Sequence, residues 1–390
     1  MVETTVPRSP TRSTTPGGVV EQLSLLDRLL PVWIFGAMAI GIGLGKIFPG
    51  LADGLDRLQI DNVSLPIAIG LLWMMYPVLA KVKYERIPAA AANRKLLGTS
   101  LTLNWIIGPA LMFGVAWLML PDHPEYRTGL ILVGLARCIA MVLIWNQLAC
   151  GDNEYAAVLV ALNSVFQIAM YTVLGYVYLT VVPGWLGAEG TALNISMWSI
   201  AKSVLIFLGV PLLAGFLTRR YLARAKGDDW YEQRFLPRLG PTALLGLLFT
   251  IVMMFALKGE VILDTPFDVA RIALPLLAYF AIMFAVAFGV SYLLGFPYRE
   301  TATLSFTAAS NNFELAIAVA IGVFGLASEE ALAAVVGPLV EVPVLIGLVY
   351  VSLWLGRRLY GAAAVGRAED AAGHAITSAS DTPHVPAKGR

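Results

Sequence analysis

The sequence predicts an all-α, polytopic membrane protein with about ten transmembrane helices. Three observations lead to this prediction. Of the 390 residues, 58% are hydrophobic and 14% are charged, and the mean hydropathy of +0.74 lies outside the range of a soluble globular domain. The apolar residues also form runs of about 20, the length that spans a bilayer. Finally, the two halves of the chain resemble each other.

Ten segments have the length and hydropathy of a membrane-spanning helix. The first five lie near Leu29–Phe48, Leu65–Ala80, Leu96–Leu120, Gly129–Ala149 and Tyr155–Val182. The second five lie near Ile200–Thr218, Pro241–Leu257, Ala270–Gly295, Thr301–Leu326 and Ala331–Leu355. The polar segments 1–28 and 356–390 are expected to be disordered cytoplasmic tails. No short apolar core with a cleavage site precedes the first span, so we expect no cleaved signal peptide.

Charged residues predict the orientation of the chain. Lys and Arg gather after the second and sixth spans and after the last one, whereas the loops after the first and seventh spans are acidic. Cytoplasmic loops carry the excess of Lys and Arg. We therefore expect a multi-pass protein of the cell inner (plasma) membrane with both termini in the cytoplasm. The basic residues are Lys81, Lys83, Arg86, Arg94, Lys95, Arg219, Arg220, Arg224, Lys226, Arg234, Arg238, Arg357, Arg358 and Arg367, and the acidic ones are Asp53, Asp56, Asp61, Glu260, Asp264 and Asp268.

The two sets of five spans match at an offset of about 175 residues. The matching motifs are Pro66-x-Ala68-x-Gly70-Leu71-Leu72 with Pro241-x-Ala243-x-x-Gly246-Leu247-Leu248, and Glu154-x-Ala156-Ala157-Val158 with Glu330-x-x-Ala333-Ala334-Val335. An odd number of spans in each half places the halves in opposite orientations, as in many secondary transporters. We therefore predict two inverted five-helix repeats, residues 29–182 and 183–355. The alternative is accidental similarity between helices rich in Leu, Ala and Gly.

Polar residues interrupt the fourth and ninth spans at equivalent positions, since adding 176 to Cys138 gives Glu314. Arg137 precedes the cysteine, and the polar run 310–312 lies just before the glutamate. An ionisable group at bilayer depth costs several kcal/mol unless it is paired or faces a cavity. Inverted-repeat transporters place their substrate at the midplane, where two discontinuous helices meet. We predict that these two helices are discontinuous and cross at the midplane, with Cys138 and Glu314 in one site.

The motifs at these positions resemble those of one family. They are Arg137-Cys138-Ile139-Ala140-Met141-Val142, Trp145-Asn146, Gly151-Asp152, Asn104-Trp105 and Asn311-Asn312-Phe313-Glu314-Leu315-Ala316. They look like the arsenical-resistance-3 type of arsenite permease, within the bile acid/sodium symporter superfamily of ten-span inverted-repeat carriers. The resemblance covers Leu29 to Arg358. It implies export of arsenite, in some members antimonite too, in exchange for protons, and hence arsenic resistance. It also implies that Cys138 and Glu314 are required for transport.

The chemistry of these residues fits such a substrate. Trivalent arsenic is thiophilic, and a single thiol keeps binding weak enough to permit release. Arsenite at neutral pH is mainly an uncharged trihydroxide, whose hydrogen-bonding groups Asn311, Asn312 and Glu314 could satisfy. A carboxyl group out of contact with water can load and release a proton near neutral pH. We therefore expect proton binding at Glu314 and arsenite binding to exclude each other.

Further polar residues at bilayer depth leave alternatives open. Arg137 is expected either to pair with Glu314 or another buried carboxylate, or to have a structural role at the helix break. Glu341 in the tenth span is either a second proton relay or a hydrogen-bonding residue between helices. Asn104 and its Trp neighbour more often hold helices together than bind ligand. Without the repeat and the resemblance, Cys138 would be interpreted as a small buried apolar residue.

Two other classes of function remain. A sodium-coupled carrier of organic anions with the same fold would need sodium ligands and a wide apolar cavity, and its thiol would have no role. An intramembrane enzyme or sensor would need a buried histidine, a metal cluster or an output domain, whereas His123, His374 and His384 lie outside the apolar segments. We therefore expect a transporter rather than an enzyme, without cofactor, metal site or nucleic-acid partner. Its expected partners are arsenite, protons and the lipid bilayer, and a homo-oligomer stays open.

Overall fold

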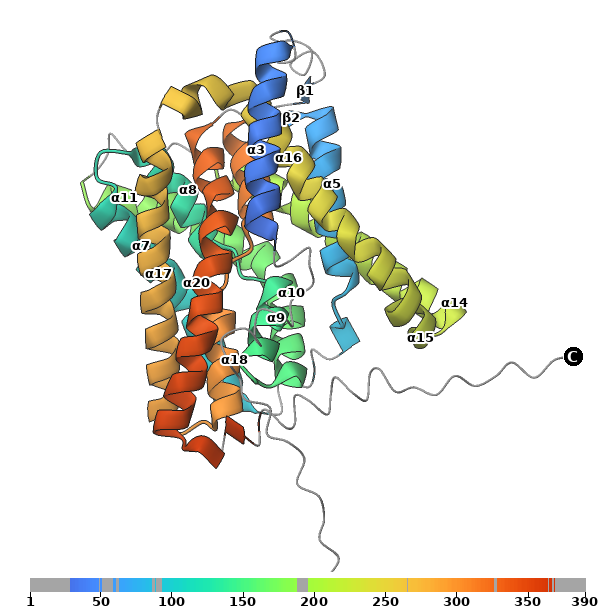
Figure 1. Cartoon of the computed structure of the whole chain (residues 1–390), viewed down its shortest axis with the longest axis vertical. Helices are drawn as coiled ribbons and strands as arrows, with labels where there is room; N and C mark the ends of the chain where they lie inside the picture. The colour runs from blue at the N-terminus through green and yellow to red at the C-terminus, as the bar shows by residue number, and fades with distance from the viewer. Residues whose placement is uncertain are drawn as a thin grey trace, which may run out of the picture.

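The computed structural model describes residues 29–48, 50, 59–60, 63–85, 88, 93–187, 196–264, 266–325, 328–363, 365–366 and 368. The expected disordered tails were 1–28 and 356–390, and the first of them and the second after residue 368 lie outside this part. The second tail begins later than expected, because the last helix continues to Leu359. So do Asp53, Asp56, Asp61, Arg86 and Arg367, which entered the prediction of orientation. The described chain is helical apart from loops and a two-stranded hairpin of β1 (Gln59–Ile60) and β2 (Val63–Ser64), which confirms the all-helical fold class (Figure 1).

Each predicted span of the first half coincides with a helical segment. The elements are α3 (Leu30–Ile47), α5 (Leu65–Ala80), α6 (Arg94–Thr102) with the π-helical turn η2 (Leu103–Ile107) and α7 (Gly108–Met119), α8 (Pro124–Leu135), α9 (Met141–Leu148), and α10 (Asn153–Tyr176) with η3 (Val177–Val181) and α11 (Val182–Trp185). Asp152 caps α10, because its Oδ1 accepts the N–H groups of Glu154 and Tyr155 at 3.1 and 3.0 Å.

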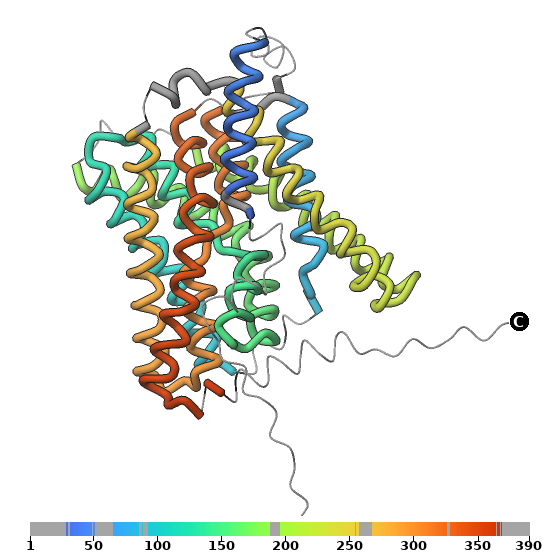
Figure 2. Tube along the Cα trace, viewed as in Figure 1, coloured from blue at the N-terminus to red at the C-terminus, as the bar shows by residue number. Residues whose placement is uncertain are grey.

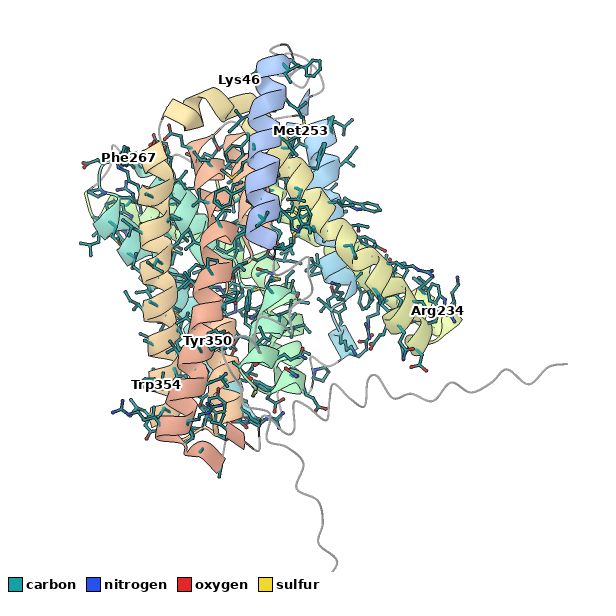
Figure 3. All side chains as sticks on the ribbon, in the orientation of Figure 1. Lys46, Arg234, Met253, Phe267, Tyr350 and Trp354 are labelled. Atoms are coloured by element: carbon teal, nitrogen blue, oxygen red, sulfur yellow. The ribbon has the colours of Figure 1, made fainter. Side chains whose placement is uncertain are left out.

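Each predicted span of the second half also coincides with helical segments. Its elements are α12 (Met197–Val204), η4 (Leu205–Gly209), α13 (Val210–Thr218), η5 (Arg219–Ala223) and α14 (Arg224–Lys226), then α15 (Asp228–Trp230), η6 (Tyr231–Phe235) and α16 (Leu236–Asp264), then α17 (Pro266–Leu293), α18 (Tyr298–Ala309), α19 (Phe313–Phe324) and α20 (Glu329–Leu359). Lys46 near the end of α3 and Trp354 near the end of α20 lie toward opposite ends of the molecule (Figure 3).

The outer surface of the bundle is apolar. Large side chains such as Leu118 and Leu293, which are 81% and 83% exposed, point away from the core. Six described helical segments are long and apolar enough to cross a membrane, and the helices Val32–Ile47, Leu65–Ala80 and Phe313–Phe324 are apolar but shorter. This apolar exterior and these lengths suit a polytopic membrane protein.

Helices α3, α5, α13 and α16 pack on one another, and small residues allow their close approach. A Cβ on Gly41 of α3 would lie 2.5 Å from the carbonyl oxygen of Val252 on α16. A Cβ on Gly246 of α16 would lie 3.0 Å from Cβ of Met74 on α5. Figure 2 shows α3, α5 and α16 together at one side of the molecule. Helices α7, α8, α17, α18, α19 and α20 pack among themselves beside this group.

Candidate functional site

The fourth and ninth predicted spans are both interrupted. Helix α8 ends at Leu135 and α9 begins at Met141, while α18 ends at Ala309 and α19 begins at Phe313. The two breaks lie against each other, because Arg137 and Asn311 form an antiparallel backbone bridge. The N–H of Asn312 also donates to the carbonyl oxygen of Ala136 at 3.0 Å. The interruptions that the sequence predicts are therefore present, and they meet.

Asn311 ties the two breaks to each other and to α20. Its Nδ2 donates to the carbonyl oxygens of Val133 at 2.8 Å and Ala136 at 3.2 Å, at the end of α8. Such terminal carbonyl groups have no partner within their own helix. The backbone N–H of Asn311 donates to Oε1 of Glu341 at 3.3 Å. The amide group thus has a structural role that its predicted function as a ligand did not include.

Asn312 begins α19. Its Oδ1 accepts the backbone N–H of Leu315 at 3.0 Å, which is the geometry of a helix N-cap. Within the described residues, Nδ2 of Asn312 and Oδ1 of Asn311 are buried without a hydrogen-bond partner. A buried polar atom without a partner is costly, so each of these two atoms is one that a polar ligand could satisfy.

Arg137 is fully buried at the first break. Its Nη1 donates to Oη of Tyr279 and to the carbonyl oxygen of Ala308, both at 3.3 Å, and its Nη2 donates to the carbonyl oxygen of Gly134. Its backbone N–H donates to Oε1 of Gln167 at 3.3 Å. In the part of the chain that the structure describes, no ion pair joins Arg137 to Glu314 or to another carboxylate. Of the two roles that the sequence left open, this geometry matches the one at the helix break.

A cavity of about 30 Å³ lies between the breaks, with room for one or two water molecules. It is lined by Cys138, Ile139, Ala140, Met141, Leu247, Asn311, Phe313, Glu314, Pro338 and Glu341. Four of the predicted site residues, Cys138, Glu314, Asn311 and Glu341, therefore meet in one cavity. Arg137 and Asn312 do not line it.

The thiol and the two carboxyl groups differ in exposure. Sγ of Cys138 accepts the backbone N–H of Val142 at 3.3 Å, and the residue is 5% exposed. Glu341 is 4% exposed, whereas Glu314 keeps a larger part of its surface accessible. Of these three residues, Glu314 is thus the most exposed.

Two polar residues that position the site were not singled out from the sequence, namely Tyr279 on α17 and Gln167 on α10. Both are fully buried and both contact Arg137. A tyrosine hydroxyl and a glutamine amide within apolar spans are signals that could have indicated them, because such groups need partners in a membrane. Trp105 donates through Nε1 to Oδ1 of Asn163 at 3.2 Å, and this contact between helices matches the structural interpretation of the Asn104–Trp105 motif.

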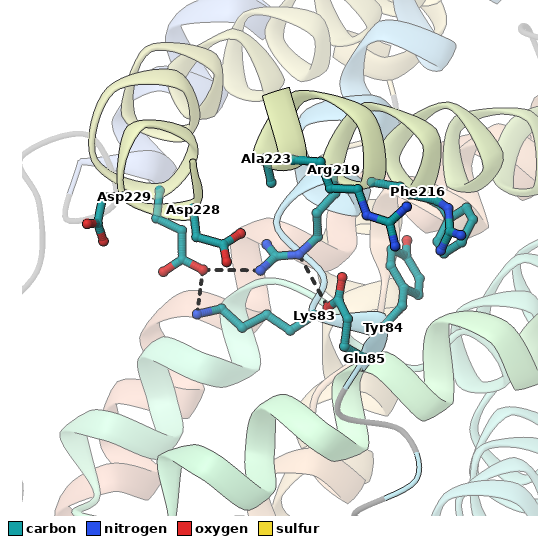
Figure 4. A pocket seen from close by; sticks show the side chains of 11 residues that line it. Lys83, Tyr84, Glu85, Phe216, Arg219, Ala223, Asp228 and Asp229 are labelled. Atoms are coloured by element: carbon teal, nitrogen blue, oxygen red, sulfur yellow. Dashed lines mark hydrogen bonds and ion pairs between the residues drawn. The ribbon is translucent and has the colours of Figure 1, made fainter. Parts of the chain in front are cut away.

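A second, larger cavity of about 680 Å³ lies beside the end of α5 (Figure 4). Lys83 Nζ lies 2.6 Å from Oε1 of Glu232, and Arg219 contacts the same oxygen at 3.2 Å and Glu85 Oε2 at 3.4 Å. Its charged lining residues are Lys83, Arg219, Arg220 and Arg224 with Glu85, Asp228, Asp229 and Glu232. Because equal numbers of opposite charges face one another, this cavity has the character of an ion-pair network rather than of a site for a charged ligand.

The chain is similar to a family model and to known proteins. Residues 68–265 match the model of the Sodium Bile acid symporter family. Arsenical-resistance protein Acr3 of Corynebacterium glutamicum is 54% identical over 350 residues, which cover 90% of this chain and 95% of the relative. Acr3 of Alkaliphilus metalliredigens is 33% identical over 341 residues, 85% of this chain and 93% of that one. The transporter slr0944 of Synechocystis sp. is 37% identical over 346 residues, 84% and 88% of the two chains.

Proposed function

Because the chain belongs to the Acr3 arsenical-resistance proteins within the sodium bile acid symporter family, we propose that it exports arsenite from the cell in exchange for protons. Membership of this family makes it a transporter rather than an enzyme, as the sequence predicted. The observation that carries the proposal is the cavity between the two helix breaks, in which one thiol, Cys138, meets two carboxyl groups, Glu314 and Glu341.

Each group has a separate task in this exchange. The thiol of Cys138 is the soft ligand for trivalent arsenic. When the As–S bond forms, one arsenite hydroxyl group leaves with the thiol proton as water, and the reverse reaction releases the arsenite from this single sulfur. The unpartnered Oδ1 of Asn311, a residue that lines the cavity, accepts a hydrogen bond from an arsenite hydroxyl group as that group loses its hydration water. Antimonite, a larger trihydroxide with the same preference for sulfur, is a second substrate of the same site.

The two carboxyl groups carry the proton. Glu314, the more accessible of the two, takes up a proton from outside, and its neutral form accepts the hydrogen bonds of bound arsenite more weakly than the carboxylate does. Glu341 is linked to the break through the N–H of Asn311 and acts as the inner relay. Import of one proton adds about 2.3 kcal/mol per 100 mV of membrane potential to the export of a neutral solute.

The architecture that we propose is two inverted five-helix repeats, residues 29–182 and 183–355. The chain then crosses the cell inner (plasma) membrane ten times. The antiparallel contact between Arg137 and Asn311 supports this arrangement, because the two interrupted helices run in opposite directions through the crossing. With the basic segments around Lys83 and Arg219 inside, both termini are cytoplasmic.

Everted membrane vesicles test the proposal. With an imposed proton gradient and no sodium, wild-type vesicles are expected to accumulate arsenite. Glu314→Gln and Cys138→Ser are each expected to reduce this uptake at least about tenfold, since each removes an interaction that a site of few contacts cannot replace. Cys150→Ser, the matched control, changes a thiol outside the cavity and is expected to transport as the wild type does.

Insertion of each variant is verified by the amount of protein in the vesicle membrane. Proton-driven uptake that is lost in both site variants and kept in Cys150→Ser supports a shared site for metalloid and proton. Wild-type vesicles that need sodium, or site variants that transport normally, contradict the antiport mechanism.

A second candidate, sodium-coupled carriage of an organic anion, is favoured by the match to the sodium bile acid symporter model. The cavity argues against it. Pockets for drug-sized organic ligands measure roughly 300–1,000 Å³, whereas the space between the breaks is about 30 Å³. This space is therefore nearer in size to a small trihydroxide than to a steroid-sized anion.

A further inference from the structure

The guanidinium group of Arg137 lies at the C-terminal ends of two half-helices at once. Its Nη2 donates to the carbonyl oxygen of Gly134, in the last turn of α8, and its Nη1 to that of Ala308, in the last turn of α18. The C-terminus of a helix carries about half a negative charge. One fixed cation therefore neutralises both of these helix ends.

The surrounding helices are shaped to admit this group. A Cβ on Gly108 of α7 would lie 2.8 Å from Nη1, so the missing side chain leaves the space that the guanidinium fills. Tyr279 of α17 supplies a hydroxyl oxygen at 3.3 Å, and Arg137 is 0% exposed. Among the described residues, no carboxylate forms an ion pair with it. Its charge is balanced by neutral oxygen atoms, which is how proteins hold an alkali cation.

The opposite helix ends face the cavity. Cys138 precedes α9 and Glu314 lies in the first turn of α19, where helix N-termini carry partial positive charge. The crossing thus has two different environments. Arg137 lies at the helix C-termini, which carry partial negative charge, and the thiol and the carboxyl group lie at the helix N-termini, which carry partial positive charge. Inverted-repeat transporters place coupling cations against half-helix C-termini and unwound carbonyl groups, which is the environment that the arginine occupies here.

We propose that Arg137 is a tethered cation that permanently occupies the position of a coupling sodium ion, so that the transport cycle needs no sodium. Arg137 is then a positioning residue that determines ion selectivity, and it binds neither arsenite nor the transported proton. This inference rests on the proposed function and explains why proton exchange can run in this fold without a second ion.

The first test measures cation-dependent stability rather than transport. Thermal unfolding of the purified protein in detergent is followed in choline, sodium and dilute guanidinium chloride at equal ionic strength. Arg137→Ser vacates the position, and its melting temperature is expected to rise by about 3 °C or more in sodium or guanidinium relative to choline. Wild type and Arg127→Ser, a buried arginine that lies over the Trp117 ring away from the crossing, are expected to show no such rise. A folded Arg137→Ser protein that is indifferent to these cations overturns the proposal.

The second test separates charge from bulk and does not depend on the serine variant. Arg137→Lys keeps a cation on a long stem, whereas Arg137→Met keeps a similar stem without charge. In vesicles without sodium, the lysine variant is expected to retain arsenite uptake within about tenfold of the wild type. The methionine variant is expected to transport at least about tenfold less than the lysine variant, because the two helix ends then lack their cation. Equal uptake by the two inserted variants overturns the proposal.

The two proposals fail in different ways. If wild-type vesicles take up no arsenite, the proposed function is wrong, but the cation response of Arg137→Ser still decides the role of the arginine. If wild-type uptake is proton-driven and Arg137→Ser shows no cation response, the transport function stands and the tethered-cation role does not.

Discussion

Gly337 on α20 is a position at which the site tolerates little change. A Cβ at this residue would overlap the ring of Phe313, which is 2% exposed and directly precedes Glu314 on α19. The ring is also held from another side by Phe280, with ring centroids 6.4 Å apart. Because Phe313 has little room to move, Gly337→Ala is expected to push α19 away from α20 and to displace Glu314 from the cavity.

The magnitude follows from two opposing effects. Overpacking of a dense core costs about 1–3 kcal/mol, and the better helix propensity of alanine returns about 0.5–1 kcal/mol. The net loss of about 0–2.5 kcal/mol corresponds to a fall of up to roughly 3 °C in melting temperature, because the entropy of unfolding grows with chain length. The matched control is Gly347→Ala on the same helix, where a Cβ would meet nothing within 4 Å. There only the propensity effect remains, so this variant is expected to be as stable as the wild type or up to about 1 kcal/mol more stable.

The assay combines thermal unfolding in detergent with proton-driven arsenite uptake by vesicles. Gly337→Ala is expected to lose at least about tenfold in uptake, because small displacements of reacting groups have large effects on rate, and Gly347→Ala is expected to lose none. If Gly337→Ala melts at or above the temperature of Gly347→Ala and transports normally, the packing of Phe313 does not position Glu314 and the reasoning is refuted.

Two further pairs of substitutions test the contacts around the crossing by thermal unfolding. Asn311→Ala removes two hydrogen bonds between the breaks and is expected to cost about 2–3 kcal/mol. Asn104→Ala removes bonds to Ser100 only, one turn away on the same helical segment, and is expected to cost about 1 kcal/mol or less. Equal losses contradict the role of Asn311 in joining the two breaks. Thr303→Val removes the hydroxyl that joins α18 to Asn146 and to the Asp152 N–H, at an expected cost of about 1–3 kcal/mol. Thr307→Val removes only bonds within α18 and is expected to cost less, and a reversed order of the two losses contradicts the role of Thr303 between elements.

The parts of the fold that follow from hydropathy were predictable. The span Leu65–Ala80 has the bounds of α5, and the interruptions at Arg137 and at residues 310–312 were visible because polar residues stand there in otherwise apolar runs. The matching offset of the two halves then placed Cys138 and Glu314 in one site, and both line the same cavity. The predicted inverted repeats remain a proposal that the antiparallel crossing supports.

Other contacts leave no trace in a sequence. Arg137 is held by the carbonyl oxygens of Gly134 and Ala308, and since every residue has a carbonyl group, composition cannot indicate which ones are used. Glu341 meets the N–H of Asn311 because α20 packs beside the second break, and a packing contact of this kind cannot be derived from hydropathy. Leu247 reaches the cavity from α16 as one more apolar residue of its span. The hairpin of β1 and β2 lies in a segment whose composition indicates only an acidic loop.

The backbone contact between the two helix breaks also bears on how the protein is made. Ala136 and Asn312, whose backbone groups bond each other, are 176 positions apart (312 − 136). At a synthesis rate of about 5–20 residues per second, the ribosome needs roughly 10–35 s to supply the second partner after the first. During that interval the unwound segment after α8 is already made, whereas the carbonyl group of Ala308, which accepts a hydrogen bond from Arg137 in the folded protein, is not. Peptide groups without partners are not tolerated in lipid, so this segment must be kept hydrated or shielded by the insertion machinery until α18 arrives.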